Sequence, residues 1–192
     1  MQRVVFIFHG VGGGPGENWF PWLKRELKYN RCNVIVPQFP TPEGQILKNW
    51  LKTFEECLKN ANLNEEDLND AIFIGHSLGG LFMLSLLEKY KIKMAVFVAS
   101  FGKLPSNKFD ESMTTFAPPE RADFDWRKIQ ENCQKFLVYQ GDNDPYVKLG
   151  TAHHLARNLH AKLELLRGAG HFNGSTGYFK FPLLLEAIKK IF

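Results

Sequence analysis

The sequence has few cysteines and no long apolar run. Its three cysteines, Cys32, Cys57 and Cys133, form no C-x-x-C or other close pair among the 192 residues. A disulfide-stabilised secreted protein is therefore not indicated, and we expect a reduced, cytoplasmic setting. The apolar run 4–8 is shorter than the core of a signal peptide and far shorter than a membrane span. We expect no association with a membrane.

The sequence also lacks a dense block of charge of one sign. It has 24 Lys and Arg against 20 Asp and Glu, a net charge of +4, and its basic residues are spread along the chain. Nucleic-acid binding is therefore not expected. The hydrophobic fraction of 44% and the charged fraction of 23% are ordinary for a globular protein. The length fits one domain over 1–192, and we expect a monomer or a weak homodimer.

Short apolar segments alternate with segments of helical spacing along the whole chain. The apolar segments are rich in β-branched and aromatic residues, as buried strands are. This alternation predicts an α/β fold, a three-layer α/β/α sandwich with a mostly parallel sheet of about six strands. The expected strands are 3–8, 33–36, 71–74, 94–99, 136–139 and 163–166, and the expected helices are 19–29, 44–58, 78–90, 146–159 and 181–191.

The stretch 101–125 interrupts this alternation. Its prolines exclude a continuous helix, and its phenylalanines are scattered among polar residues. Such a long connection leaves from a strand end, where parallel sheets bind their ligands. It could cover a site and shape a pocket, or it could be an ordered surface loop.

The most specific motif is G-x-S-x-G at 75–79, directly after one expected strand and directly before one expected helix. This context is typical of a nucleophile elbow, a sharp turn that exposes a serine and leaves space only for glycine around it. Ser77 is therefore the candidate nucleophile. The N–H of Leu78, at the start of the helix, is expected to stabilise the negative charge that develops on an attacked carbonyl oxygen.

A serine hydroxyl needs a base, usually a histidine that a carboxylate orients. His171 follows the expected strand 163–166, and Asp142 and Asp144 both follow the expected strand 136–139. The chain order serine, acid, histidine agrees with an elbow-type site. Both aspartates remain candidates for the acid, and the other one would form the turn.

Other histidines do not suggest a metal site. His153, His154 and His160 lack the i, i+4 spacing of a paired helical site. We therefore expect no metal and no cofactor.

A glycine-rich loop at 8–16 follows the first expected strand. It has neither the Lys-Ser or Lys-Thr pair of a P-loop nor the G-x-G-x-x-G of a dinucleotide site. With an elbow elsewhere in the chain, we interpret it as the source of a second N–H for the oxyanion, from Val11 or from Gly12. Trp19 lies just beyond and could wall an apolar pocket or belong to the core of the first helix. The candidate pocket residues are Gly10, Gly12, Trp19, His76 and Phe172.

Taken together, these residues resemble the α/β-hydrolase superfamily. The narrower likeness is to the small serine hydrolases typified by retinoblastoma-binding protein nine and its bacterial YdeN-like relatives. Beyond the elbow, it rests on the glycine-rich opening, the pair Trp19 and Trp22, and the stretches 124–133, 141–146 and 170–173. It covers nearly the whole chain.

The resemblance implies a compact hydrolase fold without a large cap, which cleaves a small ester or amide. It also implies the triad Ser77, Asp144 and His171, because the spacing from Gly141 to Asp144 resembles the usual acid loop of such enzymes. Binding of the retinoblastoma protein is not expected, because the sequence around Cys57 lacks the leucine and the glutamate of the Leu-x-Cys-x-Glu motif. The alternatives are a non-catalytic binding module on the same fold, and acyl transfer in place of hydrolysis.

Overall fold

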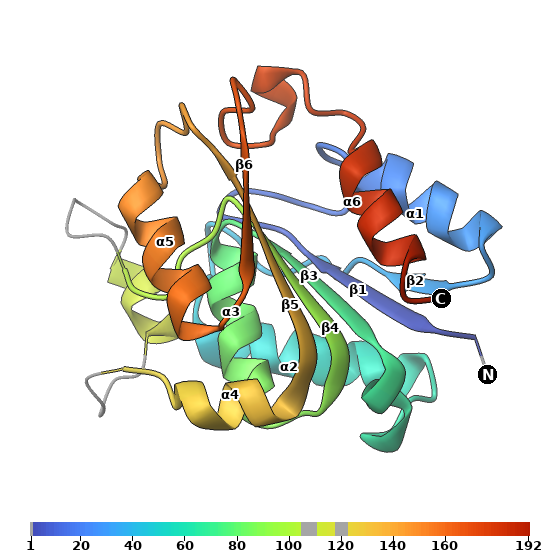
Figure 1. Cartoon of the computed structure of the whole chain (residues 1–192). Coiled ribbons are helices and arrows are strands. Elements are labelled where there is room, and N and C mark those ends of the chain that lie inside the picture. The colour runs from blue at the N-terminus through green and yellow to red at the C-terminus, as the bar shows by residue number, and fades with distance from the viewer. Residues whose placement is uncertain (1, 105–110, 118–122) are drawn as a thin grey trace.

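The computed structural model describes residues 2–104, 111–117 and 123–192, and the sheet in these ranges has six strands. Across the sheet the order is β2-β1-β3-β4-β5-β6, and each neighbouring pair is parallel (Figure 1). The predicted parallel sheet is therefore confirmed. The strands are β1 (Val4–Phe8), β2 (Asn33–Ile35), β3 (Ile72–His76), β4 (Ile92–Val98), β5 (Cys133–Gly141) and β6 (Lys162–Leu166).

Helices cover both faces of this sheet and complete three layers (Figure 1). One face carries α1 (Phe20–Tyr29) and α6 (Pro182–Lys189). The other face carries α2 (Leu47–Asn60), α3 (Leu78–Leu87), α4 (Trp126–Asn132) and α5 (Leu149–Asn158). The described residues also form three short 3₁₀ helices, η1 (Glu66–Asp70), η2 (Glu111–Phe116) and η3 (Gly174–Thr176). Within the described ranges no cap is inserted, and no helix is long and apolar enough to cross a membrane.

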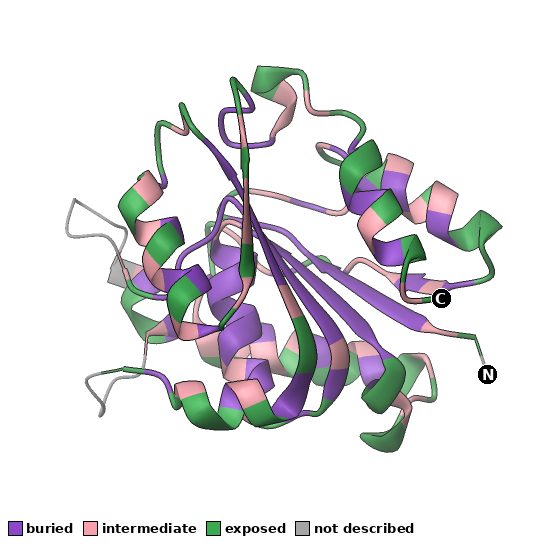
Figure 2. Cartoon of the chain, viewed as in Figure 1, coloured by how far each residue is buried: buried purple, intermediate pink, exposed green. Residues whose placement is uncertain are grey.

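Strand β1 is apolar throughout because both of its faces are buried. All five residues of β1 are buried: Val4, Phe6 and Phe8 pack into the core beneath α2 and α3, and Val5 and Ile7 into the core beneath α1 and α6. This is the two-residue period of a strand. At the edge of the sheet, β6 is only partly covered (Figure 2).

The strand register brings the first loops of the site together. Phe8 is level with Gly75, and His76 is level with Val98, so β1, β3 and β4 end side by side. The loops after β1, β3, β5 and β6 therefore open at one edge of the sheet, where parallel sheets bind ligands.

The connection 101–125 contains more structure than its sequence pattern indicates. Among its described residues it forms η2, and Phe116 at the end of η2 is fully buried against the ring of Trp50. Residues 105–110 and 118–122 lie outside the described ranges. The helix α4, which directly follows, was not predicted. It has seven residues, too few for a clear period, and its start is fixed by Asp125, whose carboxylate accepts a hydrogen bond from the N–H of Lys128.

Candidate active site

Ser77 lies on a sharp turn between β3 and α3. Its backbone has φ 54° and ψ −122°, in the region that residues with a side chain rarely adopt. Two contacts with the end of β4 support this strained turn: the Ser77 N–H donates to the carbonyl of Val98 at 3.0 Å, and the hydroxyl of Ser100 donates to the carbonyl of Ser77 at 2.8 Å. The turn is thus held in place by its neighbours.

Glycines leave the space that this turn needs. A Cβ atom on Gly75 would lie 2.5 Å from the Cα of Gly80, and one on Gly79 would collide with the carbonyl of Phe8. A Cβ on Gly80 would collide with the side chain of Ser100. Strand β3, helix α3 and the end of β1 can approach this closely only without side chains at these positions.

The candidate base and the candidate acid lie on two other loops, and their side chains are in contact. His171 Nδ1 lies 2.9 Å from Asp144 Oδ2. The Asp144 side chain is inaccessible to solvent and accepts three further hydrogen bonds, from the N–H groups of Tyr146 at 2.8 Å and Val147 at 3.0 Å and from Gln140 Nε2 at 3.2 Å. Such a carboxylate can hold the proton of His171 on Nδ1 and leave Nε2 free to accept one.

These contacts keep Asp144 ionised. Burial alone would raise the pKa of the carboxyl, but the hydrogen bond and charge of His171, together with the N–H groups of Val147 and Tyr146, outweigh burial and lower it. The ring of Tyr146 also packs edge-on against the imidazole of His171, with 4.9 Å between the ring centres.

The second aspartate of this loop has a different partner. Asp142 Oδ1 accepts a hydrogen bond from the N–H of Gly168 at 2.8 Å, and Asn143 Oδ1 accepts one from the N–H of Gly170 at 2.7 Å. Both side chains therefore tie the loop after β5 to the loop that carries His171. Of the two candidate acids, Asp144 is the one in contact with this histidine.

The glycine-rich loop after β1 runs directly past Ser77. A Cβ on Gly10 would lie 2.9 Å from the Cβ and 3.4 Å from the Oγ of Ser77. The N–H of Gly12 already donates to the hydroxyl of Thr41 at 2.7 Å. The N–H groups of Val11 and Leu78 donate to no residue in the described part of the chain, and Leu78 is the first residue of α3.

Two further histidines are buried at this edge of the sheet. His9 Nδ1 lies 2.8 Å from the carbonyl of Gly10, and its Nε2 accepts a hydrogen bond from the N–H of Phe39 at 3.0 Å. His76 Nε2 lies 2.8 Å from the carbonyl of His171. Burial lowers the pKa of His9, and burial followed by the nearby charge of His171 lowers the pKa of His76 to about 3. Both rings are therefore neutral near pH 7.

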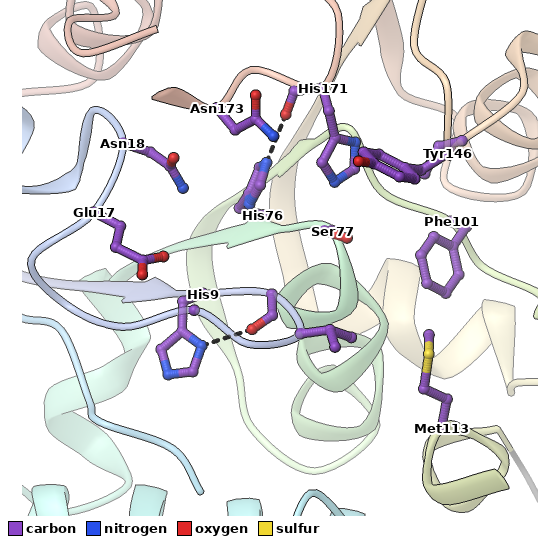
Figure 3. A pocket seen from close by; sticks show the side chains of 14 residues that line it. His9, Glu17, Asn18, His76, Ser77, Phe101, Met113, Tyr146, His171 and Asn173 are labelled. Atoms are coloured by element: carbon purple, nitrogen blue, oxygen red, sulfur yellow. Dashed lines mark hydrogen bonds between the residues drawn. The ribbon is translucent and has the colours of Figure 1, made fainter. Parts of the chain in front are cut away.

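A cavity of about 450 Å³ lies between the loop of Ser77, the loop of His171 and the glycine-rich loop (Figure 3). Gly10, Val11, His76, Ser77 and His171 were predicted for the site, and all of them line it. Leu78 and Asp144 lie behind the lining. The remaining lining residues are His9, Gly13, Glu17, Asn18, Phe101, Met113, Tyr146, Val147 and Asn173.

Three of the residues expected in the pocket do not line this cavity. Trp19 and Phe172 are fully buried and joined by a hydrogen bond of 3.1 Å from the Trp19 indole N–H to the Phe172 carbonyl. They belong to the core beneath α1 and α6, where both contact the ring of Phe181. Gly12 faces Thr41 instead. An apolar pattern near a site does not distinguish a pocket wall from the core that supports it.

Several residues of the site were not predicted. His9 belongs to the His-Gly pair that opens the glycine-rich loop, and this pair is a usable sequence signal. Gln140 is a fully buried amide whose Nε2 reaches Asp144, and no sequence pattern indicates it. Met113 comes from the irregular connection 101–125. In the described part of the chain, no group of three or more His, Cys, Asp or Glu side chains is arranged to hold a metal ion.

Similarity to a serine hydrolase family model and to YdeN covers nearly the whole chain. A family model described as serine hydrolase matches residues 5–190. The curated Bacillus subtilis (strain 168) protein YdeN, named as a hydrolase, is 26% identical over all of this chain and 97% of its own length. The crystal structure of the B. subtilis ydeN gene product superposes with a TM-score of 0.85 at 24% identity, covering 99% of this chain and 98% of that one. Est1E from Butyrivibrio proteoclasticus superposes with a TM-score of 0.71 at 18% identity, covering 98% of this chain and 86% of that one. The chain therefore belongs to the serine hydrolase family and has a YdeN-like α/β-hydrolase fold.

Proposed function

We propose that this protein hydrolyses a small ester or amide through an acyl-enzyme on Ser77. The observation that carries the proposal is the hydrogen bond between His171 and the buried carboxylate of Asp144, beside a cavity that Ser77 also lines. In this assignment Ser77 is the nucleophile, His171 the base, and Asp144 the group that orients the base.

Acylation begins when a substrate carbonyl lies over Ser77. His171 Nε2 takes the proton of the hydroxyl as Oγ bonds to the carbonyl carbon, and Asp144 stabilises the resulting imidazolium. Among the described residues Ser77 Oγ has no hydrogen-bond partner. This is common in free enzymes, in which the hydrogen bond between nucleophile and base tightens only once substrate is bound.

The N–H groups of Leu78 and Val11 are the proposed oxyanion donors. Neither is used by another described residue, and Leu78 N–H lies at the positive end of the α3 dipole. Collapse of the tetrahedral intermediate transfers the proton from His171 to the leaving alcohol or amine. A water molecule, deprotonated by the same histidine, then attacks the acyl group and releases the acid and free Ser77.

The cavity also limits the size and polarity of the substrate. Its volume of about 450 Å³ is within the usual range for small-molecule sites. Phe101 and Met113 form an apolar wall on one side of Ser77, and Glu17, Asn18 and Asn173 lie on the other side (Figure 3). We infer a substrate with an apolar group on one side of the scissile bond and a polar group on the other.

Turnover of a substrate panel tests the proposal. The panel combines p-nitrophenyl esters from acetate to octanoate with aminoacyl arylamides. The wild type should cleave some members and Ser77→Ala none above background. Ser85→Ala, which removes a hydroxyl from α3 away from the cavity lining, should retain wild-type turnover. A wild type that cleaves no member would contradict hydrolysis and favour a binding module, and product analysis with added alcohol or amine would detect acyl transfer.

A further inference from the structure

His76 links the turn that carries Ser77 to the loop that carries His171. It precedes Ser77 in the chain, and its ring lies against the loop of His171 with 4.8 Å between the two ring centres. Its Nε2 is 2.8 Å from the carbonyl oxygen of His171 (Figure 3). Because a carbonyl can only accept, Nε2 carries the proton and donates it to this bond.

The loop that carries His171 needs such support. The residues on either side of His171 both have positive φ, 55° at Gly170 and 52° at Phe172. This conformation is uncommon for a phenylalanine, so surrounding contacts must hold it. Trp19 donates to the carbonyl of Phe172, and His76 donates to the carbonyl of His171 itself.

The His76 ring must also remain uncharged if it is to support proton transfer to His171. His171 becomes a cation when it takes the proton of Ser77, and a second cation so close would oppose that step. The rings of Trp19 and Phe20 pack against His76 at 6.4 and 5.9 Å between centres, and this burial, with the nearby charge of His171, lowers its pKa to about 3. His76 therefore supplies a hydrogen-bond donor without a charge.

We propose that His76 is a positioning residue, whose Nε2–H fixes the distance and orientation of His171 relative to Ser77. The proposal rests on the hydrolase mechanism described above. It gives His76 no contact with the reacting atoms. Its removal should therefore lower kcat far more than it raises KM, because displacement of the base affects the chemical step more than substrate binding.

A matched pair of variants separates the donor from the bulk of the ring. In His76→Gln the amide Nε2 extends about as far as Nε2 of histidine and can still donate, whereas His76→Met has similar length and no donor. With the best p-nitrophenyl ester, we expect kcat of His76→Met to fall by about tenfold to a hundredfold, with KM within about twofold. His76→Gln should stay within about threefold of the wild-type kcat.

Two more variants keep the test decisive. Trp19→Phe removes a donor to the neighbouring carbonyl of the same loop and should lower the melting temperature, with kcat within about threefold of wild type. His76→Asn carries its donor too close to the backbone to reach the carbonyl of His171, so it should lose kcat as His76→Met does, even if the methionine variant fails to fold.

The outcomes distinguish this proposal from the hydrolase mechanism. If the wild type is inactive on every substrate, the hydrolase mechanism itself fails. If the wild type is active and His76→Met or His76→Asn matches His76→Gln in kcat, the positioning role is wrong. It is also wrong if Trp19→Phe loses as much kcat as His76→Met, because any loop contact would then serve equally.

Discussion

Asp144 Oδ2 lies 2.9 Å from Nδ1 of His171. This one contact distinguishes the two aspartates that follow β5, since Asp142 is bonded to the backbone of Gly168. In the proposed mechanism it sets the tautomer of the histidine, and with it the atom that acts as base.

The two aspartates should differ sharply when each becomes asparagine. Asp144→Asn replaces the acceptor that holds the Nδ1 proton, so kcat should fall by about 10³-fold to 10⁴-fold, as expected for a histidine in the wrong tautomer. Asp142→Asn weakens a loop contact and should lower the melting temperature, with kcat within about tenfold of wild type. Steady-state kinetics on one ester compares them, and equal losses of kcat would contradict the assignment.

A single methyl group at Gly10 should impair the site. In Gly10→Ala the new Cβ would lie 2.9 Å from the Cβ of Ser77, so the loop or the serine must move. We expect kcat/KM to fall by about tenfold to a hundredfold. Gly16→Ala is the matched control, because a Cβ there meets nothing within 4 Å. Wild-type kcat/KM in Gly10→Ala would mean that the loop is not held against the serine.

The buried neutral His76 should make stability depend on pH. Burial lowers its folded pKa to about 3, below the ordinary 6.5, so the unfolded chain binds one more proton between these values. The free energy of unfolding should therefore fall by about 1.4 kcal/mol per pH unit on acidification below 6.5 through this group. Urea unfolding at pH 4.5, 5.5 and 6.5 measures this slope. The slope of the free energy of unfolding against pH should be smaller in His76→Gln than in the wild type by about one bound proton. Equal slopes in the two proteins would show that His76 is protonated in the folded protein.

The apolar wall of the cavity should set the acyl or alcohol chain length. Met113 is 5% exposed and faces the cavity beside Phe101. Met113→Trp should reduce the ratio of octanoate to acetate turnover by about tenfold, because the larger ring fills the apolar side. Met113→Leu, nearly equal in volume, should keep the ratio within about threefold. An unchanged octanoate-to-acetate ratio in the tryptophan variant would place the acyl chain of the substrate on the other side of Ser77.

Much of the fold was predictable because its signals are local. The parallel sheet follows from apolar strands that alternate with helices, and the elbow follows from glycines around Ser77. Element boundaries were less predictable where side chains decide them. The helix expected from residue 146 begins at Leu149, because Asp144 binds the N–H groups of Tyr146 and Val147 in a turn. The helix expected from residue 44 begins at Leu47, because Gly44 has φ +73°.

The serine and the histidine of the candidate site were predictable as residues that line one cavity, and its surroundings less so. The choice between Asp142 and Asp144 depends on which N–H groups donate hydrogen bonds to each carboxylate. This is a property of the folded loops. Trp19 follows the same apolar pattern whether it faces a pocket or the core. The contribution of Met113 to the cavity depends on a connection that has no periodic pattern.

The most direct test of the account is covalent labelling with a fluorophosphonate, which bonds to a serine activated by a neighbouring base. Intact-protein mass spectrometry should find one adduct on the wild type, and peptide mapping should locate it on Ser77. Ser77→Ala should remain unlabelled, and Ser85→Ala should label like the wild type. Equal labelling of the wild type and Ser77→Ala, or an adduct mapped to another residue, would contradict the central claim.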